Sequence, residues 1–156
     1  CDTYRYFLLI LANSRFLISH KNSEISVVFM QNNSKQSVLL VENDSAVLDH
    51  LSKRFKKLGM YVITARDGYE GYIRACKEHP DFIVSETLLS NINGFRMSRL
   101  LKYDERYKNI VIILITKNEL SMVEEMHKAS GADNILQKPF KFSQLVDHLK
   151  ILLPQE

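Results

Sequence analysis

The sequence predicts an α/β domain in which a doubly wound, five-stranded parallel sheet carries helices on both faces, as a three-layer sandwich. Five short apolar segments alternate with five segments whose apolar residues have helical spacing, and such alternation is typical of parallel sheets. The apolar segments also lack the polar and apolar alternation of a half-exposed strand, which indicates burial on both faces.

The expected strands are the shortest and most apolar runs, and turn residues or helical segments bound each of them. The run IVIILIT is the most apolar, so we expect it at or near the centre of the sheet. The five strands are expected at residues 37–42, 60–65, 81–85, 110–116 and 134–137.

The segments between these runs have the apolar spacing of helices that cover a sheet. In residues 44–59, for example, Leu48, Leu51 and Phe55 share one face and Gly59 supplies the stop. The five helices are expected at residues 44–59, 69–79, 95–105, 120–130 and 141–153.

Composition narrows the class of protein. A chain of 156 residues with 46% hydrophobic and 25% charged residues suits one soluble domain with its own core. The net charge of +3 comes without a basic stripe, so we expect no nucleic-acid partner. The two cysteines form no disulfide framework, which favours a reducing, cytoplasmic location.

Residues 1–34 differ from the rest, and we treat them as an N-terminal extension to a domain at 35–156. Its apolar run YFLLILA, residues 6–12, is too short to span a bilayer, so we expect no membrane partner. Met30 precedes a short polar leader and is a candidate for the native start; residues 1–29 are then translated upstream sequence or the end of a preceding domain. Because residues 1–29 show no helix or strand pattern that the core needs, we expect them to be dispensable.

Polar side chains follow four of the five expected strands, at the ends that parallel strands share. Carboxylates hold Mg²⁺, whereas a hydroxyl and an ammonium contact phosphoryl oxygens, so the set predicts anion chemistry beside a hard cation. Asp44 is equally consistent with a helix N-cap. No Walker A or GxGxxG sequence is present. The rim residues are Glu42, Asn43, Asp44, Glu86, Thr116 and Lys138.

Residues 37–153 resemble a response-regulator receiver domain, the CheY-like phosphoacceptor module of two-component signalling. The resemblance rests on four segments: VLLVEND, PDFIVSETLLSNINGF, ILIT and GADNILQKPF. It implies a flavodoxin-like fold, a cis Lys-Pro peptide, Mg²⁺ as the cofactor and phosphorelay signalling rather than enzymatic turnover. It also implies a protein partner, either a histidine kinase or another signalling target.

Four residues depart from the family pattern, all of them at the phosphorylation machinery. The resemblance implies an Asp phosphoacceptor and a second acidic metal ligand, and the chain has Glu86 and Asn43 there. It also implies a small residue where phosphate enters the site, and the chain has Lys117 there. On the fifth strand it implies an aromatic residue that swings between an inward and an outward position, and the chain has Ile135 there. The phosphate-contact positions, Thr116 and Lys138, are kept.

These departures weaken both the nucleophile and the metal site. Glu places its carboxylate about 1.5 Å further from the backbone than Asp does, the length of one C–C bond. A misplacement of about 1 Å can slow an in-line transfer about 100-fold. We expect Mg²⁺ binding through Glu42, Asn43 and Glu86 to be weak or lost, because Asn43 is neutral.

We therefore predict a degenerate receiver, or pseudo-receiver, that acts as a phosphorylation-independent protein-interaction module. One alternative is a working phosphoacceptor in a phosphorelay that uses Glu86; another is a flavodoxin-like domain that binds a small molecule or nucleotide. Glu86 is expected to pair with Lys138, from a strand next to its own, or with Lys117. A fixed Glu86 makes the domain either permanently signalling or permanently silent.

Overall fold

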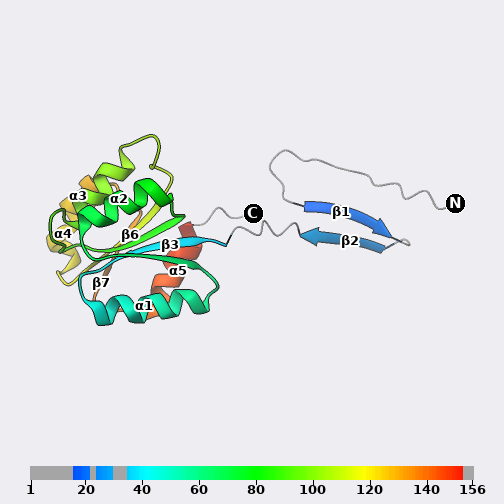
Figure 1. The fold of residues 1–156 in the computed structure, drawn as a ribbon, viewed down its shortest axis with the longest axis horizontal. Helices are drawn as coiled ribbons and strands as arrows, with labels where there is room; N and C mark the ends of the chain where they lie inside the picture. Colours follow the sequence, from blue (N-terminus) through cyan, green and yellow to red (C-terminus); the bar gives the residue numbers. More distant parts are fainter. Residues whose placement is uncertain (1–15, 22–23, 30–34, 153–156) are drawn as a thin grey trace. The chain divides into compact units, whose positions relative to one another are not determined.

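The computed structural model describes residues 16–21, 24–29 and 35–152, and the chain divides into two units, 1–34 and 35–156. In the first unit, β1 (Phe16–Lys21) and β2 (Glu24–Phe29) pair in antiparallel fashion (Figure 1). The sequence analysis did not foresee these two strands, although both contain β-branched and aromatic residues. In the described residues they pair with each other and not with the sheet of the second unit, so the expectation that residues 1–29 are dispensable stays a prediction. The apolar run at 6–12 and Met30 lie outside the described residues.

The second unit is built on a five-stranded sheet in the order β4-β3-β5-β6-β7, with all four strand pairs parallel. This confirms the predicted fold class. The IVIILIT strand, β6, lies next to the central strand β5, as expected. The strands are β3 (Ser37–Val41), β4 (Tyr61–Ala65), β5 (Phe82–Glu86), β6 (Val111–Thr116) and β7 (Asn134–Gln137).

The described residues of this unit also form five helices, which lie on the two faces of the sheet and complete the three layers (Figure 1). One core packs α1 and α5 against one face of the sheet, around Val38 and Leu40 of β3, and Phe55 of α1 stacks edge-on against Phe142 of α5. The other core packs α2 and α3 against Leu39 and Val41, on the opposite face. The helices are α1 (Ser45–Lys57), α2 (Gly68–Glu78), α3 (Gly94–Lys102), α4 (Leu120–Ser130) and α5 (Phe142–Leu152).

The predicted helix at 95–105 is too long, because α3 ends at Lys102. Asp104 accepts a hydrogen bond from the backbone N–H of Arg106 at 2.9 Å, and the side chains of the two residues also pair, which holds a turn in place of the last helical residues. No helix among the described residues has the length and apolar character needed to cross a bilayer.

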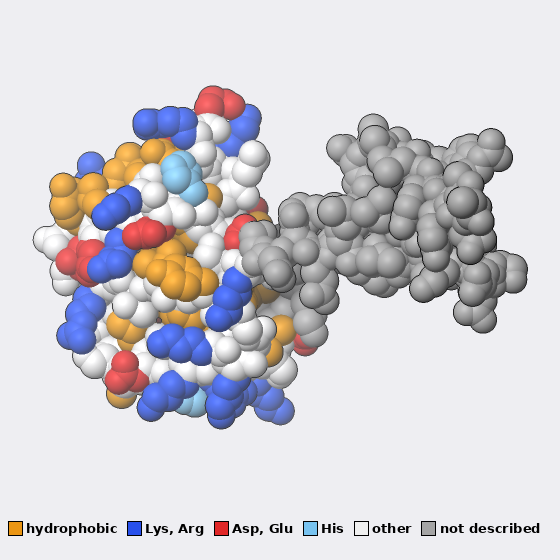
Figure 2. Space-filling view, turned by 45° about the vertical axis from the view of Figure 1, so that its right-hand side comes forward, with side chains coloured by type: hydrophobic (Ala, Val, Ile, Leu, Met, Phe, Trp, Pro, Cys, Tyr) orange, Lys and Arg blue, Asp and Glu red, His pale blue; other side chains and the backbone are white. Residues whose placement is uncertain are grey.

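Exposed Lys and Arg side chains gather over α1, along the lower edge of the domain in Figure 2. Arg54, Lys56 and Lys57 occupy the last turn of α1. Cations at the C-terminal end of a helix stabilise its dipole, which accounts for this local cluster.

Candidate functional site

Four strand ends bring the predicted rim residues together. Glu86 is the last residue of β5 and Thr116 the last residue of β6, while Glu42 and Lys138 directly follow β3 and β7. The backbone N–H of Lys138 donates to the carbonyl of Thr116 at 2.8 Å, which continues the β6–β7 pairing into the site. The expectation that Glu86 and Lys138 end adjacent strands is wrong, because β6 lies between β5 and β7.

The side chain of Lys138 reaches across the end of β6 and forms ion pairs with two carboxylates. Its Nζ atom lies 2.6 Å from Oε2 of Glu86 and 3.0 Å from Oε2 of Glu42. The Lys138 side chain is 19% exposed, whereas those of Glu86 and Glu42 are 3% and 5% exposed. Lys117 is exposed and has no carboxylate partner among the described residues, so the cation that Glu86 pairs with is Lys138.

The other oxygen of Glu86 is also occupied. Oε1 accepts hydrogen bonds from the backbone N–H of Thr87 at 2.7 Å, the Thr87 hydroxyl at 3.0 Å and the backbone N–H of Leu88 at 3.1 Å. The carboxylate therefore bends back onto the loop after β5, and both of its oxygens have partners within the protein.

The loop after β5 is closed by Gly94, whose N–H donates to the carbonyl of Thr87 at 2.9 Å. A Cβ atom at this position would lie 2.3 Å from the carbonyl oxygen of Glu86, so the close approach of the two segments requires glycine. The same contact fixes the backbone N–H groups that bind the Glu86 carboxylate.

The environment keeps both members of the ion pair charged. Burial alone raises the pKa of Glu86, but the hydrogen bond and charge of Lys138, together with the donors of Leu88 and Thr87, hold that pKa below its ordinary value. Burial alone lowers the pKa of Lys138, but hydrogen bonds and charge from Glu86 and Glu42 raise it above its ordinary value.

The acidic segment after β3 is committed to local hydrogen bonds. Oε1 of Glu42 accepts from the backbone N–H of Asp44 at 3.0 Å. Asp44 is the N-cap of α1 and accepts from the N–H groups of Ala46 and Val47 at 2.9 and 3.2 Å. Asn43 is exposed between them.

These residues make a poor set of ligands for Mg²⁺, in line with the expected weak binding. Mg²⁺ requires octahedral oxygen coordination and favours anionic ligands, whereas Glu42 and Glu86 share the ammonium of Lys138 and Asn43 is neutral. Within the described part of the chain, no three His, Cys, Asp or Glu side chains are grouped so as to hold a metal.

The remaining predicted positions surround the ion pair. Thr116 is fully buried, and its hydroxyl accepts from the backbone N–H of Asn118 at 3.1 Å. Lys117 borders a cavity of about 520 Å³ that Asn43 also lines. Ile135 is partly buried against the core on the α2 and α3 side. The Lys138–Pro139 peptide is cis, as the resemblance implied.

Sequence reasoning missed the donors of Thr87 and Leu88. The hydroxyl of Thr87 was visible as a polar residue directly after Glu86. The backbone donors gave no signal, because they depend on how the loop folds.

The family model of the response regulator receiver domain matches residues 38–150. The chain belongs to this family. Receiver domains are signalling modules that interact with histidine kinases and signalling targets.

Named relatives agree with the assignment. The chain is similar to the DNA-binding dual master transcriptional regulator RpaA of Synechocystis, with 30% identity over 118 residues, 74% of this chain and 48% of that protein. It therefore spans about half the length of this relative. Among solved structures it is similar to the chemotaxis response regulator CheY4 of Vibrio cholerae, with a TM-score of 0.71, 28% identity and coverage of 77% of this chain and 100% of the other.

A second solved structure bears on the cofactor. It is the receiver domain of the sensor histidine kinase PA1611 of Pseudomonas aeruginosa, with a TM-score of 0.67, 27% identity and coverage of 76% of this chain and 95% of the other. That domain coordinates a magnesium ion in its active-site cleft. Mg²⁺ is thus a cofactor found within the family, and no other cofactor is indicated.

Proposed function

We propose that this receiver domain acts without phosphorylation, as a protein-interaction module. The ion pairs of Lys138 with Glu86 and Glu42 hold the rim in a single conformation. The observation that carries the proposal is the occupancy of both Glu86 oxygens, Oε2 by Lys138 and Oε1 by Thr87 and Leu88. A carboxylate with this many partners has to lose stabilising contacts before it can attack a phosphoryl group.

The electrostatics of the rim support the same proposal. Lys138 neutralises part of the charge that Mg²⁺ would need, and the neutral Asn43 adds none. Without a divalent cation, the carboxylates of Glu42 and Glu86 repel an incoming phosphoryl group. We therefore infer that the domain has no catalytic step and no tight Mg²⁺ site.

Glu86 acts, in this proposal, as a fixed internal charge rather than as an imitation of a phosphorylated Asp. An imitation would place the carboxylate outward, where a partner or a switch residue can respond to it. Glu86 is instead 4% exposed and bends back onto its own loop. We expect the partner to be a histidine kinase or another signalling protein, met in the cytoplasm, that recognises the domain in this single state.

Intact mass spectrometry tests the proposal. The full chain is incubated with acetyl phosphate and Mg²⁺, beside a Glu86→Gln variant that keeps the size of the side chain. We expect both proteins to keep their original mass. A substantial species heavier by one phosphoryl group in the native protein, and lost in Glu86→Gln, would show a working phosphoacceptor instead.

A further inference from the structure

A hollow of about 700 Å³ lies beside α2 and α3, apart from the ion pair around Lys138. Tyr72 of α2 lines it together with Arg96, Arg99 and Leu100 of α3. Tyr103, the C-cap of α3, and the two residues after it complete the lining. The volume lies within the range of roughly 300 to 1,000 Å³ that is typical of small-molecule sites.

Two arginines and two carboxylates line the hollow, and in the described part of the chain ion-pair partners are found only for the carboxylates. Its two carboxylates are both neutralised by cations that do not line it: Asp104 pairs with Arg106 at 2.7 Å, and Glu105 with Lys108 at 2.5 Å. Arg96 and Arg99 are exposed, and neither has a carboxylate partner among the described residues. Two guanidinium groups are thus left to bind an anion.

Aromatic rings accompany these guanidinium groups. Arg96, Arg99 and Tyr103 follow one another at spacings of three and four residues, which places them on one face of the chain at α3. The Cζ atom of Arg99 lies 5.5 Å from the centroid of the Tyr103 ring, a cation–π contact that orients the guanidinium. Tyr103 is 71% exposed, so a large part of its ring is open to a ligand.

We propose that this hollow binds a nucleotide, with its base against Tyr103 or Tyr72 and its phosphates on Arg96 and Arg99. Every base has a π-face that stacks on an aromatic ring, and arginine binds phosphate oxygens in a bidentate manner. An acidic peptide would use the charges of Arg96 and Arg99 but would leave the rings of Tyr72 and Tyr103 without a role. The proposal does not depend on how Glu86 behaves.

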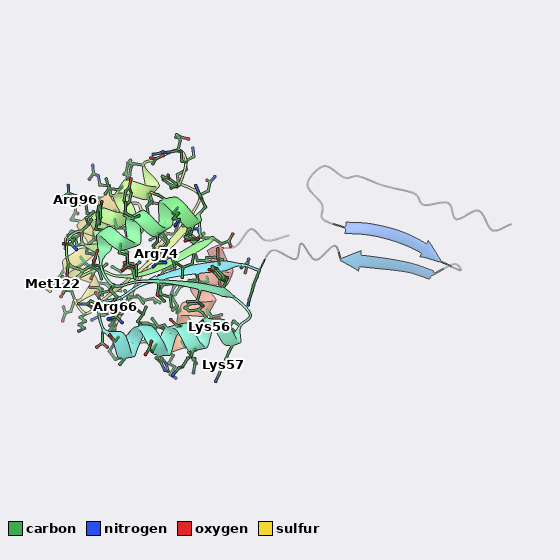
Figure 3. The ribbon with its side chains drawn as sticks, in the orientation of Figure 1. Lys56, Lys57, Arg66, Arg74, Arg96 and Met122 are labelled. Atoms are coloured by element: carbon green, nitrogen blue, oxygen red, sulfur yellow. The ribbon has the colours of Figure 1, made fainter. Side chains whose placement is uncertain are left out.

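The test is a titration of the full chain with ATP in the absence of divalent metal, followed by NMR of the backbone amides and by calorimetry. The double variant Arg96→Gln with Arg99→Gln removes the charges, and Tyr103→Ala removes the ring. Arg74→Gln is the matched control, because Arg74 is an exposed arginine of the neighbouring helix α2 that pairs with Glu70 and does not line the hollow (Figure 3). Titrations with adenosine and with pyrophosphate measure the separate contributions of the base and of the phosphates to the affinity.

We expect saturable amide shifts at residues 96–105 and an affinity for ATP that exceeds that for pyrophosphate. The double variant should weaken ATP binding about 10- to 100-fold, the loss expected for charge-assisted hydrogen bonds. Tyr103→Ala should weaken it about 5- to 100-fold, and Arg74→Gln should leave it unchanged. Three results would each overturn the proposal: absence of saturable shifts, ATP binding that survives the double variant, or pyrophosphate binding as tightly as ATP.

Discussion

Replacement of Lys138 by Met removes the only cation that the described residues place within 4 Å of Glu86 and Glu42. Exposed ion pairs contribute about 0 to 1 kcal/mol, whereas removal of one partner from a buried pair costs about 3 to 5 kcal/mol. Lys138 is 19% exposed and its two carboxylates are 5% exposed or less, so the pair lies near the buried limit. We therefore expect Lys138→Met to lower the free energy of unfolding by about 3 kcal/mol, at the lower end of the range for a buried pair.

Removal of Glu86 in the same protein should recover part of this loss. The double variant Lys138→Met with Glu86→Leu no longer buries that unpaired carboxylate, so it should be more stable than Lys138→Met alone. Because the two side chains touch, we expect a coupling energy of about 1 to 3 kcal/mol. Glu42 stays unpaired in the double variant, so the recovery is incomplete.

Urea unfolding followed by circular dichroism measures these differences, which suits a chain with no Trp. Lys108→Met is the matched control, because Lys108 and Glu105 form an ion pair whose side chains are 48% and 86% exposed. It should cost less than about 1 kcal/mol. Additive effects of Lys138→Met and Glu86→Leu, or a loss no larger than in the control, would refute the buried pair.

Three further predictions concern pH, metal and the N-terminal unit. The folded pKa of Glu86 lies below its unfolded value of about 4.3, so its contribution to stability is full above that pH and is lost as the pH falls through the folded pKa. In urea titrations between about pH 5 and 3, the free energy of unfolding of Glu86→Gln should therefore fall less than that of the native protein. An equal dependence of the unfolding free energy on pH in the two proteins would contradict this. Mg²⁺ at submillimolar concentration should cause no saturable NMR shifts at Glu42, Asn43 and Glu86, and localised saturable shifts there would show a competent metal site. A shortened protein that begins at Met30 should stay soluble and melt cooperatively, because both cores of the 35–156 unit lie within it; aggregation or a melting temperature many degrees lower would show that the first unit is needed.

The sheet and its helices were predictable because the three inner strands β3, β5 and β6 are buried along almost their whole length and the helices between the strands have one apolar face. Spatial order was harder to predict, since the order of strands along the chain does not reveal that β6 separates Glu86 from Lys138. The strands β1 and β2 escaped an argument based on alternation with helices, because in the described residues they pair with each other and no helix lies between them. The bent conformation of Glu86 was also out of reach, because it depends on loop N–H groups that leave no trace in side-chain chemistry.

The central claim is that Glu86, Asn43 and Lys117 together keep this rim from accepting a phosphoryl group, rather than the extra methylene of Glu86 alone. The most direct test compares the native protein, Glu86→Asp, and the triple variant Glu86→Asp, Asn43→Asp and Lys117→Ala by intact mass after acetyl phosphate and Mg²⁺. Thr116 and Lys138 are already in place, so the triple change repairs the reach of the nucleophile, the acidic pair and the entrance together. We predict no phosphorylated species for the native protein, little for Glu86→Asp and a slow but measurable fraction for the triple variant. If Glu86→Asp is phosphorylated as fast as the triple variant, then Asn43 and Lys117 impose no barrier and the central claim is wrong.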